Sequence, residues 1–281
     1  MPSGRAGATQ PGAMGLPLPD TLTPSKLASF VSCPLSFRFA YLDRLPELPS
    51  PQLVRGTLVH RVLQLLFSSG PPDGRTPERV KVAFAVTWEA LLPSEIAALG
   101  LGPRELGRFE QQARDLLDRY LSMEDPASVH AIGIELDLRA EIEGIELRGI
   151  IDRLDLLPNG DLAVVDYKTG RAPRPEQTRA RMTALLFYAL LCELALGKAP
   201  SELRLMYLGD GVVVTESPTE QSLRGVRQRA LAVWRALERA CGTGDFRAHP
   251  SPLCRSCTYR HLCPATGGEP GAASRAVATA G

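Results

Sequence analysis

Two short apolar segments joined by a turn constrain the middle of this chain more than any other feature. The first contains Asp152, and the second contains Asp166 and Lys168. Residues 158–160 between them read Pro-Asn-Gly, and Asn-Gly between apolar runs strongly predicts a β-hairpin. Aspartate is disfavoured inside strands, so two aspartates in one apolar hairpin indicate a functional constraint.

The register of this hairpin decides whether its charged side chains share a face of the sheet. A two-residue loop would pair Asp152 with Tyr167 and place the two aspartates on opposite faces. A three-residue loop, with Gly160 in the left-handed region, pairs Asp152 with Asp166 and puts both on the face of Lys168. We predict the three-residue loop.

Two carboxylate ligands beside an ammonium group are what a Mg²⁺-dependent phosphodiesterase needs. Mg²⁺ is usually held by one or two carboxylates together with substrate phosphate, and it lowers the pKa of a bound water. Lys168 would orient the attacking water or neutralise charge that builds on the phosphorus. The alternative is a surface hairpin with solvated Asp and Lys side chains, which is the usual role of an Asp-x-Lys triplet. The pair of aspartates favours the catalytic interpretation.

Six cysteines supply a second constellation, and three of them form a Cys-x2-Cys-x5-Cys group near the C-terminus. The start of the chain lacks the apolar segment of a signal peptide, so we expect an intracellular protein whose cysteines bind a metal or cluster. Cys192 and Cys241 are expected in the core. Spacing alone does not separate iron–sulfur from zinc, and His261 offers another zinc ligand. The predicted ligands are Cys33, Cys254, Cys257 and Cys263.

Charge and hydropathy say less about function. The 281 residues include 32 basic and 31 acidic ones, a formal charge of +1, so no global field indicates a nucleic-acid partner. Four arginines after the second strand either follow a phosphate backbone or begin a solvated helix, and we weigh both equally. No run of 18 apolar residues is present, so no membrane span is expected. The arginines are Arg171, Arg174, Arg179 and Arg181.

The element pattern predicts an α/β fold with a mixed sheet under helical cover. Residues 1–22 and 265–281 are expected to be disordered tails. Residues 23–264 are expected to form one domain, with a helical part at 23–125, a sheet core at 126–243 and a cysteine segment at 244–264. Expected helices lie near 24–31, 37–41, 54–68, 77–93, 103–123, 177–196 and 218–241, and strands near 130–142, 145–156, 162–168, 203–208 and 212–216.

Five motifs over about residues 23–264 occur in the order found in PD-(D/E)XK nucleases of the RecB type. The chain resembles most closely the iron–sulfur members, including AddB nuclease domains, CRISPR-adaptation exonucleases and stand-alone RecB-family exonucleases. The resemblance implies a restriction-endonuclease-like core with an N-terminal helical insertion and a cysteine-stapled C-terminus. The motifs are Cys33-Pro34-x2-Phe37-Arg38-Phe39, Gly56-Thr57-Leu58-Val59-His60, Gly149-Ile150-Ile151-Asp152-Arg153-Leu154-Asp155, Asp166-Tyr167-Lys168-Thr169-Gly170 and the terminal cysteine triplet.

The resemblance also assigns roles to individual residues. It implies that His60, Asp152, Asp166 and the backbone carbonyl of Tyr167 bind the metal, and that Lys168 is the catalytic lysine. The four predicted cysteine ligands correspond to those of a [4Fe–4S] cluster. Without the resemblance, a single histidine on an apolar helix would be a packed core residue. Imidazole suits Mn²⁺ better than Mg²⁺.

One position departs from the family pattern. The family has Gln-x3-Tyr on the helix after the lysine strand, where it contacts DNA. Tyr188 is present here, but Ala184 replaces the glutamine. We expect Glu135, on an early strand, to be an exposed residue rather than a supporting member of the site.

We therefore expect a Mg²⁺- or Mn²⁺-dependent DNA nuclease, an exonuclease of repair or recombination in the bacterial cytosol. The chain lacks a G-x4-G-K-[ST] phosphate loop and is not itself an ATP-driven helicase, although family analogy suggests a separate helicase partner. The alternative is a catalytically weak iron–sulfur or zinc module that binds DNA or acts as a scaffold in a helicase–nuclease complex. The missing glutamine favours that alternative, while the intact Asp152, Asp166 and Lys168 set argues against it.

Overall fold

The computed structural model describes residues 15–47 and 49–268, apart from the side chains of residues 175–180. Most of the two predicted tails lies outside this part. One end of the N-terminal tail was predicted wrongly, because Leu22 is fully buried and forms a parallel bridge with Leu147. Leu22 donates to the Glu146 carbonyl at 2.8 Å and accepts from the Arg148 N–H at 3.0 Å.

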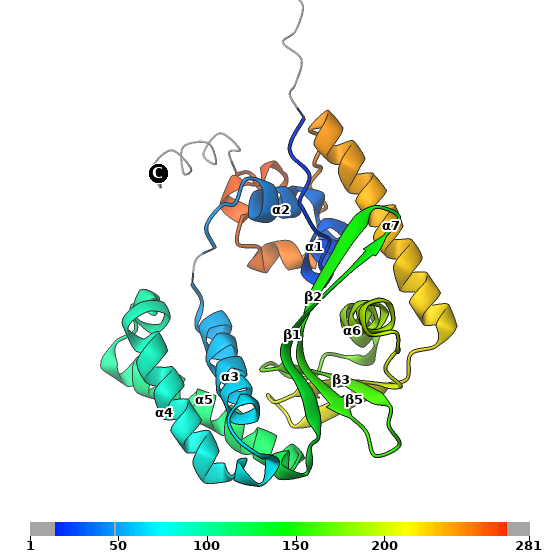
Figure 1. Cartoon of the computed structure of the whole chain (residues 1–281). Helices are drawn as coiled ribbons and strands as arrows, with labels where there is room; N and C mark the ends of the chain where they lie inside the picture. The colour runs from blue at the N-terminus through cyan, green and yellow to red at the C-terminus, as the bar shows by residue number, and fades with distance from the viewer. Residues whose placement is uncertain (1–14, 48, 269–281) are drawn as a thin grey trace, which may run out of the picture. The chain divides into compact units, whose positions relative to one another are not determined.

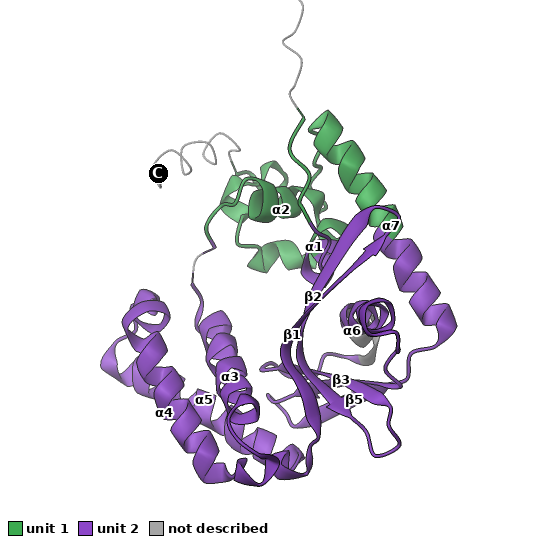
Figure 2. Cartoon of the chain, viewed as in Figure 1, with its two compact units in different colours: residues 1–20, 29–46, 231–281 green, residues 21–28, 47–230 purple. Residues whose placement is uncertain are grey.

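The chain divides into two compact units, coloured separately in Figure 2. One unit comprises Met1–Asp20, Ser29–Pro46 and Leu231–Gly281, and the other comprises Thr21–Ala28 and Glu47–Ala230. The single domain that we predicted for residues 23–264 stays a prediction. The sheet and the helices that cover it belong to the larger unit.

The larger unit contains a five-stranded sheet with the order β1-β2-β3-β4-β5. Its β3 and β4 are parallel, and the other neighbours are antiparallel. This arrangement confirms the predicted mixed α/β fold (Figure 1). The strands are β1 Ala131–Ile142, β2 Ile145–Leu156, β3 Leu162–Lys168, β4 Glu202–Tyr207 and β5 Val212–Glu216.

Helix starts follow local capping signals. The Ser50 side chain accepts from the Leu53 N–H at 3.3 Å, and Thr76 accepts from the Arg79 N–H at 3.2 Å. The predicted helix at 54–68 therefore begins earlier, at Pro51. The α-helices are α1 Pro24–Ser32, α2 Pro34–Phe37, α3 Pro51–Ser68, α4 Pro77–Leu91, α5 Pro103–Met123, α6 Pro175–Leu196 and α7 Glu220–Thr243, and a short π-helix at Arg38–Leu42 follows α2.

The two faces of the sheet have different covers. Helix α6 connects β3 to β4 and packs against β1 to β4 on one face, while α3 carries α4 and α5 on the other (Figure 1). Successive side chains of β3 and β4 point alternately toward α6 and toward the α3–α5 helices. The core beneath α3–α5 takes Val165, Tyr167 and Met206 from these strands, and Leu208 from just after β4.

One helical stretch, Pro77–Leu99, is long and apolar enough to cross a membrane by composition alone. In the structure, however, α4 packs on α3, and part of its apolar surface lies in the protein core. The buried side chains of this stretch include Val80, Ala83, Phe84 and Leu91.

The β2–β3 hairpin has the predicted register. Arg153 pairs with Val165, so that Asp152 is the next residue along and stands opposite Asp166. The loop contains three residues and ends at Gly160, whose φ is +82°. Its closure is marked by the 2.8 Å bond from the Leu157 N–H to the Asp161 carbonyl.

Candidate metal centre

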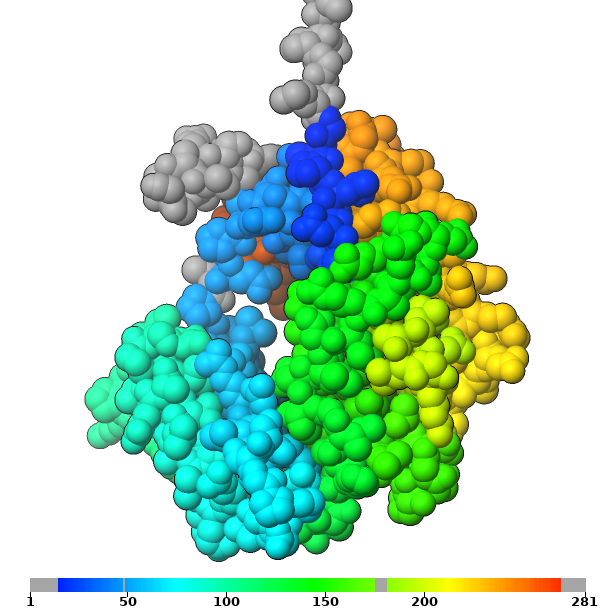
Figure 3. Space-filling model, in the orientation of Figure 1, coloured from blue at the N-terminus to red at the C-terminus, as the bar shows by residue number. Residues whose placement is uncertain are grey.

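An open cleft of about 410 Å³ lies between α3 and the strands β1 and β2. Its walls are visible in Figure 3, with α3 in light blue and the strands in green. Helix α3 contributes most of the lining, and the strands contribute two carboxylates. The lining residues are Gly56, Thr57, His60, Arg61, Gln64, Glu135 and Asp152.

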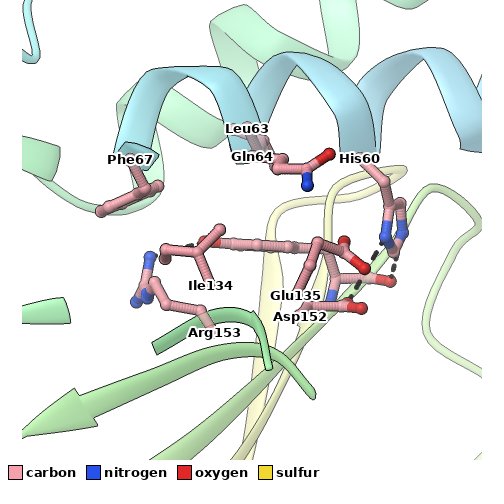
Figure 4. Close-up of a pocket in the computed structure, with 9 residues that line it drawn as sticks. His60, Leu63, Gln64, Phe67, Ile134, Glu135, Asp152 and Arg153 are labelled. Atoms are coloured by element: carbon pink, nitrogen blue, oxygen red, sulfur yellow. Dashed lines mark hydrogen bonds and ion pairs between the residues drawn. The ribbon is translucent and has the colours of Figure 1, made fainter. Parts of the chain in front are cut away.

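Asp152 is the centre of the cleft's hydrogen bonding. One of its carboxylate oxygens, Oδ2, accepts from the backbone N–H of Tyr167 at 2.8 Å and lies 3.5 Å from His60 Nδ1. The other ring nitrogen, Nε2, lies 3.0 Å from the Tyr167 carbonyl oxygen. Figure 4 shows the His60 ring pointing from α3 toward Glu135 and Asp152. The predicted ligands His60, Asp152 and the Tyr167 carbonyl thus meet at one point.

The charges around His60 favour its protonated form. Burial lowers the pKa of His60, but the hydrogen bond to Asp152 and the negative charges of Asp152 and Asp166 raise it overall. The same negatively charged surroundings also favour a divalent cation. A bound cation would take the place of the proton on His60.

Asp166 is almost fully buried beside the ammonium group of Lys168, with which it forms an ion pair. Its Oδ2 is the oxygen that faces the Lys168 ammonium group. Burial raises the pKa of Asp166 to about 6, although Lys168 opposes the shift. A buried carboxylate whose recorded ion pair is with a single lysine can also offer an oxygen to a cation, because an ionised carboxylate has several acceptor positions. These donors fit a hard divalent cation, and the imidazole suits Mn²⁺.

Glu135 was placed wrongly by the sequence interpretation. Its carboxylate lies in the cleft, and its ligand oxygen is within 4.8 Å of those of His60 and Asp152. Burial and the charge of Asp152 raise the pKa of Glu135. Its φ of +45° is unusual for a strand residue.

A sequence signal for Glu135 did exist. The turn between β1 and β2 has two residues, Glu143 and Gly144, both with positive φ as a type I′ turn requires. This turn sets the pairing of Ile134 with Arg153 and of Leu136 with Ile151. Continuing that register from the turn would have put Glu135 opposite Asp152.

A second charged cluster, the Arg153 network, lies behind the metal centre beneath α3–α5. Arg153 is 0% exposed and donates to Asp155 at 2.8 Å, to the Tyr167 hydroxyl at 2.6 Å and to Glu124. Its guanidinium also lies 4.8 Å from the ring centroid of Phe67. Because Tyr167 supplies the N–H that holds Asp152 and the carbonyl next to His60, this network fixes the backbone of the cleft.

Residues predicted to contact DNA are only partly gathered around the cleft. Tyr188 is half-buried on α6, and burial together with the charge of Asp166 raises its pKa. Its ring packs on β2 at Gly149, where a methyl group would lie 2.8 Å from Tyr188 Cε1. Arg171 and Arg174 are exposed, and the Arg179 side chain lies outside the described residues.

The four predicted cluster cysteines all belong to the smaller unit and are partly exposed. Cys33 Sγ accepts from the His249 N–H at 3.4 Å, and Cys254 Sγ accepts from the Ser251 N–H at 3.3 Å. Within the described part of the chain, no three of their sulfurs come within 4.8 Å of one another. Four sulfurs around zinc would be only about 3.8 Å apart, given a Zn–S bond of about 2.3 Å. The arrangement therefore does not fit a closed zinc site.

A model of the PD-(D/E)XK nuclease superfamily matches residues 21–264. The chain belongs to this superfamily. Gene 69 protein of Mycobacterium phage L5 is 30% identical over 85% of this chain and 94% of its own length. Gene 69 protein of Mycobacterium phage D29 is 24% identical over 85% of this chain and 95% of its own.

The fold has a solved counterpart as well. A crystal structure from Eubacterium rectale, named "Putative exonuclease", has a TM-score of 0.55 at 10% identity and covers 85% of this chain and 88% of that one. At this identity the likeness concerns the fold alone. Membership of the superfamily makes the cleft of His60, Glu135 and Asp152 the candidate centre of a metal-dependent nuclease.

Proposed function

We propose that this PD-(D/E)XK protein is a Mg²⁺- or Mn²⁺-dependent deoxyribonuclease that degrades DNA from its ends. The observation that carries the proposal is the meeting of His60, Glu135, Asp152 and the Tyr167 carbonyl in one cleft. The Asp166–Lys168 ion pair stands beside it on the next strand. Few structural roles explain so much negative charge around one histidine.

His60, Glu135, Asp152 and Asp166, with the Tyr167 carbonyl, would hold the cation. The chemistry that a bound cation supplies is a polarised phosphoryl oxygen and a lowered pKa for a neighbouring water. Lys168 orients that water toward the phosphorus and stabilises the negative charge of the transition state. The Asp152 bond to the Tyr167 N–H keeps the two strands in the geometry that this reaction needs.

The test compares the wild type with Asp166→Ala and Lys168→Ala in Mn²⁺ on end-labelled single- and double-stranded DNA. Each substitution should lower the cleavage rate by about a hundredfold to a thousandfold, because Lys168→Ala removes a donor to the transition state and Asp166→Ala removes a ligand of the cation. Asp137→Ala is the matched control, because Asp137 is an exposed carboxylate on β1 that pairs with Arg148. Equal cleavage by all four proteins would refute a nuclease centre here. Cutting of closed circular DNA would refute only the preference for ends.

The biological setting is part of the same proposal. An end-directed nuclease without a helicase motif suits DNA repair or recombination in the cytosol beside a separate helicase. The rival function is a DNA-binding scaffold, favoured by Ala184 in place of the family's glutamine. A scaffold would bind DNA and yet give no cleavage in the assay above.

We further propose a [4Fe–4S] cluster on Cys33, Cys254, Cys257 and Cys263. The support is the partial exposure of the four thiols and the backbone N–H groups that face two of them, since hydrogen bonds to sulfur tune such clusters. Protein purified without oxygen should be brown and hold about four iron atoms per chain. Cys33→Ser should lose the iron, whereas Cys192→Ala, at a buried thiol elsewhere, should keep it. A colourless preparation that contains zinc would refute the cluster.

A further inference from the structure

One face of α3 lines the open cleft on either side of the metal ligand His60. Its residues Thr57, His60, Arg61 and Gln64 recur at spacings of three and four, so they share one side of the helix. Figure 4 shows Gln64 and His60 on the side of α3 that faces Glu135. Solvent reaches this face directly, because Thr57, Arg61 and Gln64 are exposed.

Arg61 is the basic side chain of this face. Among the described residues that line the cleft, His60 is the only other group that can carry a positive charge. The carboxylates of Glu135 and Asp152 repel DNA phosphates unless a cation neutralises them. A phosphate at the metal centre would be served by that cation, whereas the next phosphates along a strand need a partner on the wall of the cleft. Arg61, one residue after His60, offers such a partner.

The partner of Arg61 within the protein holds it only loosely. The guanidinium makes one contact, at 3.4 Å, with the carboxylate of Glu95 in the short helix Leu92–Ile96. This distance is long for a hydrogen bond, and the two side chains are 48% and 40% exposed, so water screens the pair. Arg148 shows the contrast, because two of its nitrogens bond Asp137 at 2.9 Å. The other N–H groups of Arg61 have no acceptor in the described part of the chain, so they are available to an anion.

We propose that Arg61 is a substrate-binding residue whose guanidinium binds a phosphate of the DNA strand next to the one at the metal centre. Glu95 holds Arg61 in the free protein and releases it when DNA binds. The proposal rests on the proposed nuclease function and deepens it by naming a substrate contact. The planar guanidinium suits this role, because it presents paired N–H donors to two phosphate oxygens. Such contacts fix the position of a strand without reading its sequence.

The main test is Arg61→Gln, measured by the fluorescence anisotropy of a labelled single-stranded oligonucleotide in EDTA, where no metal-dependent cleavage interferes. The Kd should rise by at least about tenfold, because a hydrogen bond between charged groups is lost. The slope of log Kd against log salt should become shallower by about 0.7, because one phosphate contact fewer releases counterions. In Mn²⁺, the KM for cleavage should rise while kcat stays the same. Arg79→Gln, at an exposed arginine of α4 outside the cleft, removes the same charge and is the matched control.

Glu95→Gln tests the competition for Arg61 and should have the opposite sign. Removing the competing carboxylate should lower the Kd by about twofold to fivefold, the usual range for an exposed ion pair. Glu110→Gln, at a carboxylate of α5 that pairs with Arg114, removes an equal charge elsewhere and should change the Kd less. In the double variant Arg61→Gln/Glu95→Gln, the gain from Glu95→Gln should disappear, because it acts through Arg61.

The outcomes separate this contact from the nuclease function. An unchanged Kd or an unchanged salt slope in Arg61→Gln would refute the phosphate contact and leave the nuclease function standing. An equal loss of affinity in Arg79→Gln would refute it as well, since that is the behaviour of a general charge effect. A gain from Glu95→Gln that persists without Arg61 would refute the competition. A wild-type protein that binds DNA through Arg61 but cleaves none would instead refute the nuclease function and keep the contact.

Discussion

The β2–β3 hairpin carries buried charge on both faces, and the two faces satisfy it to different degrees. Beneath α3–α5, Arg153 reaches two carboxylates, a tyrosine hydroxyl and an aromatic ring. On the face of α6, Asp166 has only Lys168, and the Tyr207 hydroxyl has no partner among the described residues. The first face is complete as it stands and serves as a frame. The second is incomplete, and its Asp166 can still bind a cation.

The largest expected effect lies on the completed face. Arg153→Met should lower the free energy of unfolding by about 3–5 kcal/mol, because it leaves Glu124 and Asp155 buried without their counter-charge. Urea denaturation measures the change. Arg148→Met on the same strand is the control, since its exposed pair with Asp137 should contribute nothing measurable. Equal effects of the two substitutions would contradict the contrast between the faces.

A middle-sized effect is expected for a metal ligand. Glu135→Gln should weaken Mn²⁺ binding by at least about tenfold, a loss seen even for partners outside the ligand sphere. Isothermal titration with Mn²⁺ measures it. Glu141→Gln, at an exposed carboxylate on the same strand, is the matched control. Unchanged Mn²⁺ affinity in the Glu135 variant would remove this residue from the metal centre.

The smallest effect has the opposite sign. Asp166→Asn should stabilise the protein in EDTA by about 1 kcal/mol at neutral pH, because folding raises the pKa of this carboxyl from 3.8 to about 6. The folded state holds that proton more tightly, so the contribution of Asp166 to stability is present below pH 3.8 and is lost as pH rises through 6. The gain from asparagine should therefore shrink as pH falls across this window. Thermal unfolding of both proteins at several pH values measures the difference. An Asp166→Asn variant that is less stable than the wild type at neutral pH would contradict the prediction.

Local signals predicted much of the fold. The Pro-Asn-Gly loop that ends at Gly160 set the register that places Asp152 opposite Asp166, and the structure has that register. Helix and strand positions followed apolar periodicity and capping residues in the same way. These features depend on neighbours within a few positions, which a single sequence displays.

The partners of buried charges were harder to predict. Arg153 occurs within a recognised motif, but its burial depends on Glu124 and Phe67, which come from distant elements. The position of Glu135 opposite Asp152 depends on the pairing register of β1 and β2, which their connecting turn sets several residues away. The unpartnered Tyr207 hydroxyl could not be predicted, because a missing partner is a property of the assembled sheet.

The pairing of Leu22 with β2 affects the order in which the chain can fold as it is synthesised. Leu22 pairs with Leu147 on β2, so a residue made early must wait for a strand made much later. Such distant contacts form slowly, because the chain between them must first be brought together. Leu22 has no strand to pair with until β2 has been synthesised. The backbone of β2 around Leu147 likewise lacks this partner until Leu22 has docked. The pairing of Leu22 with β2 is therefore among the last contacts of the larger unit to form.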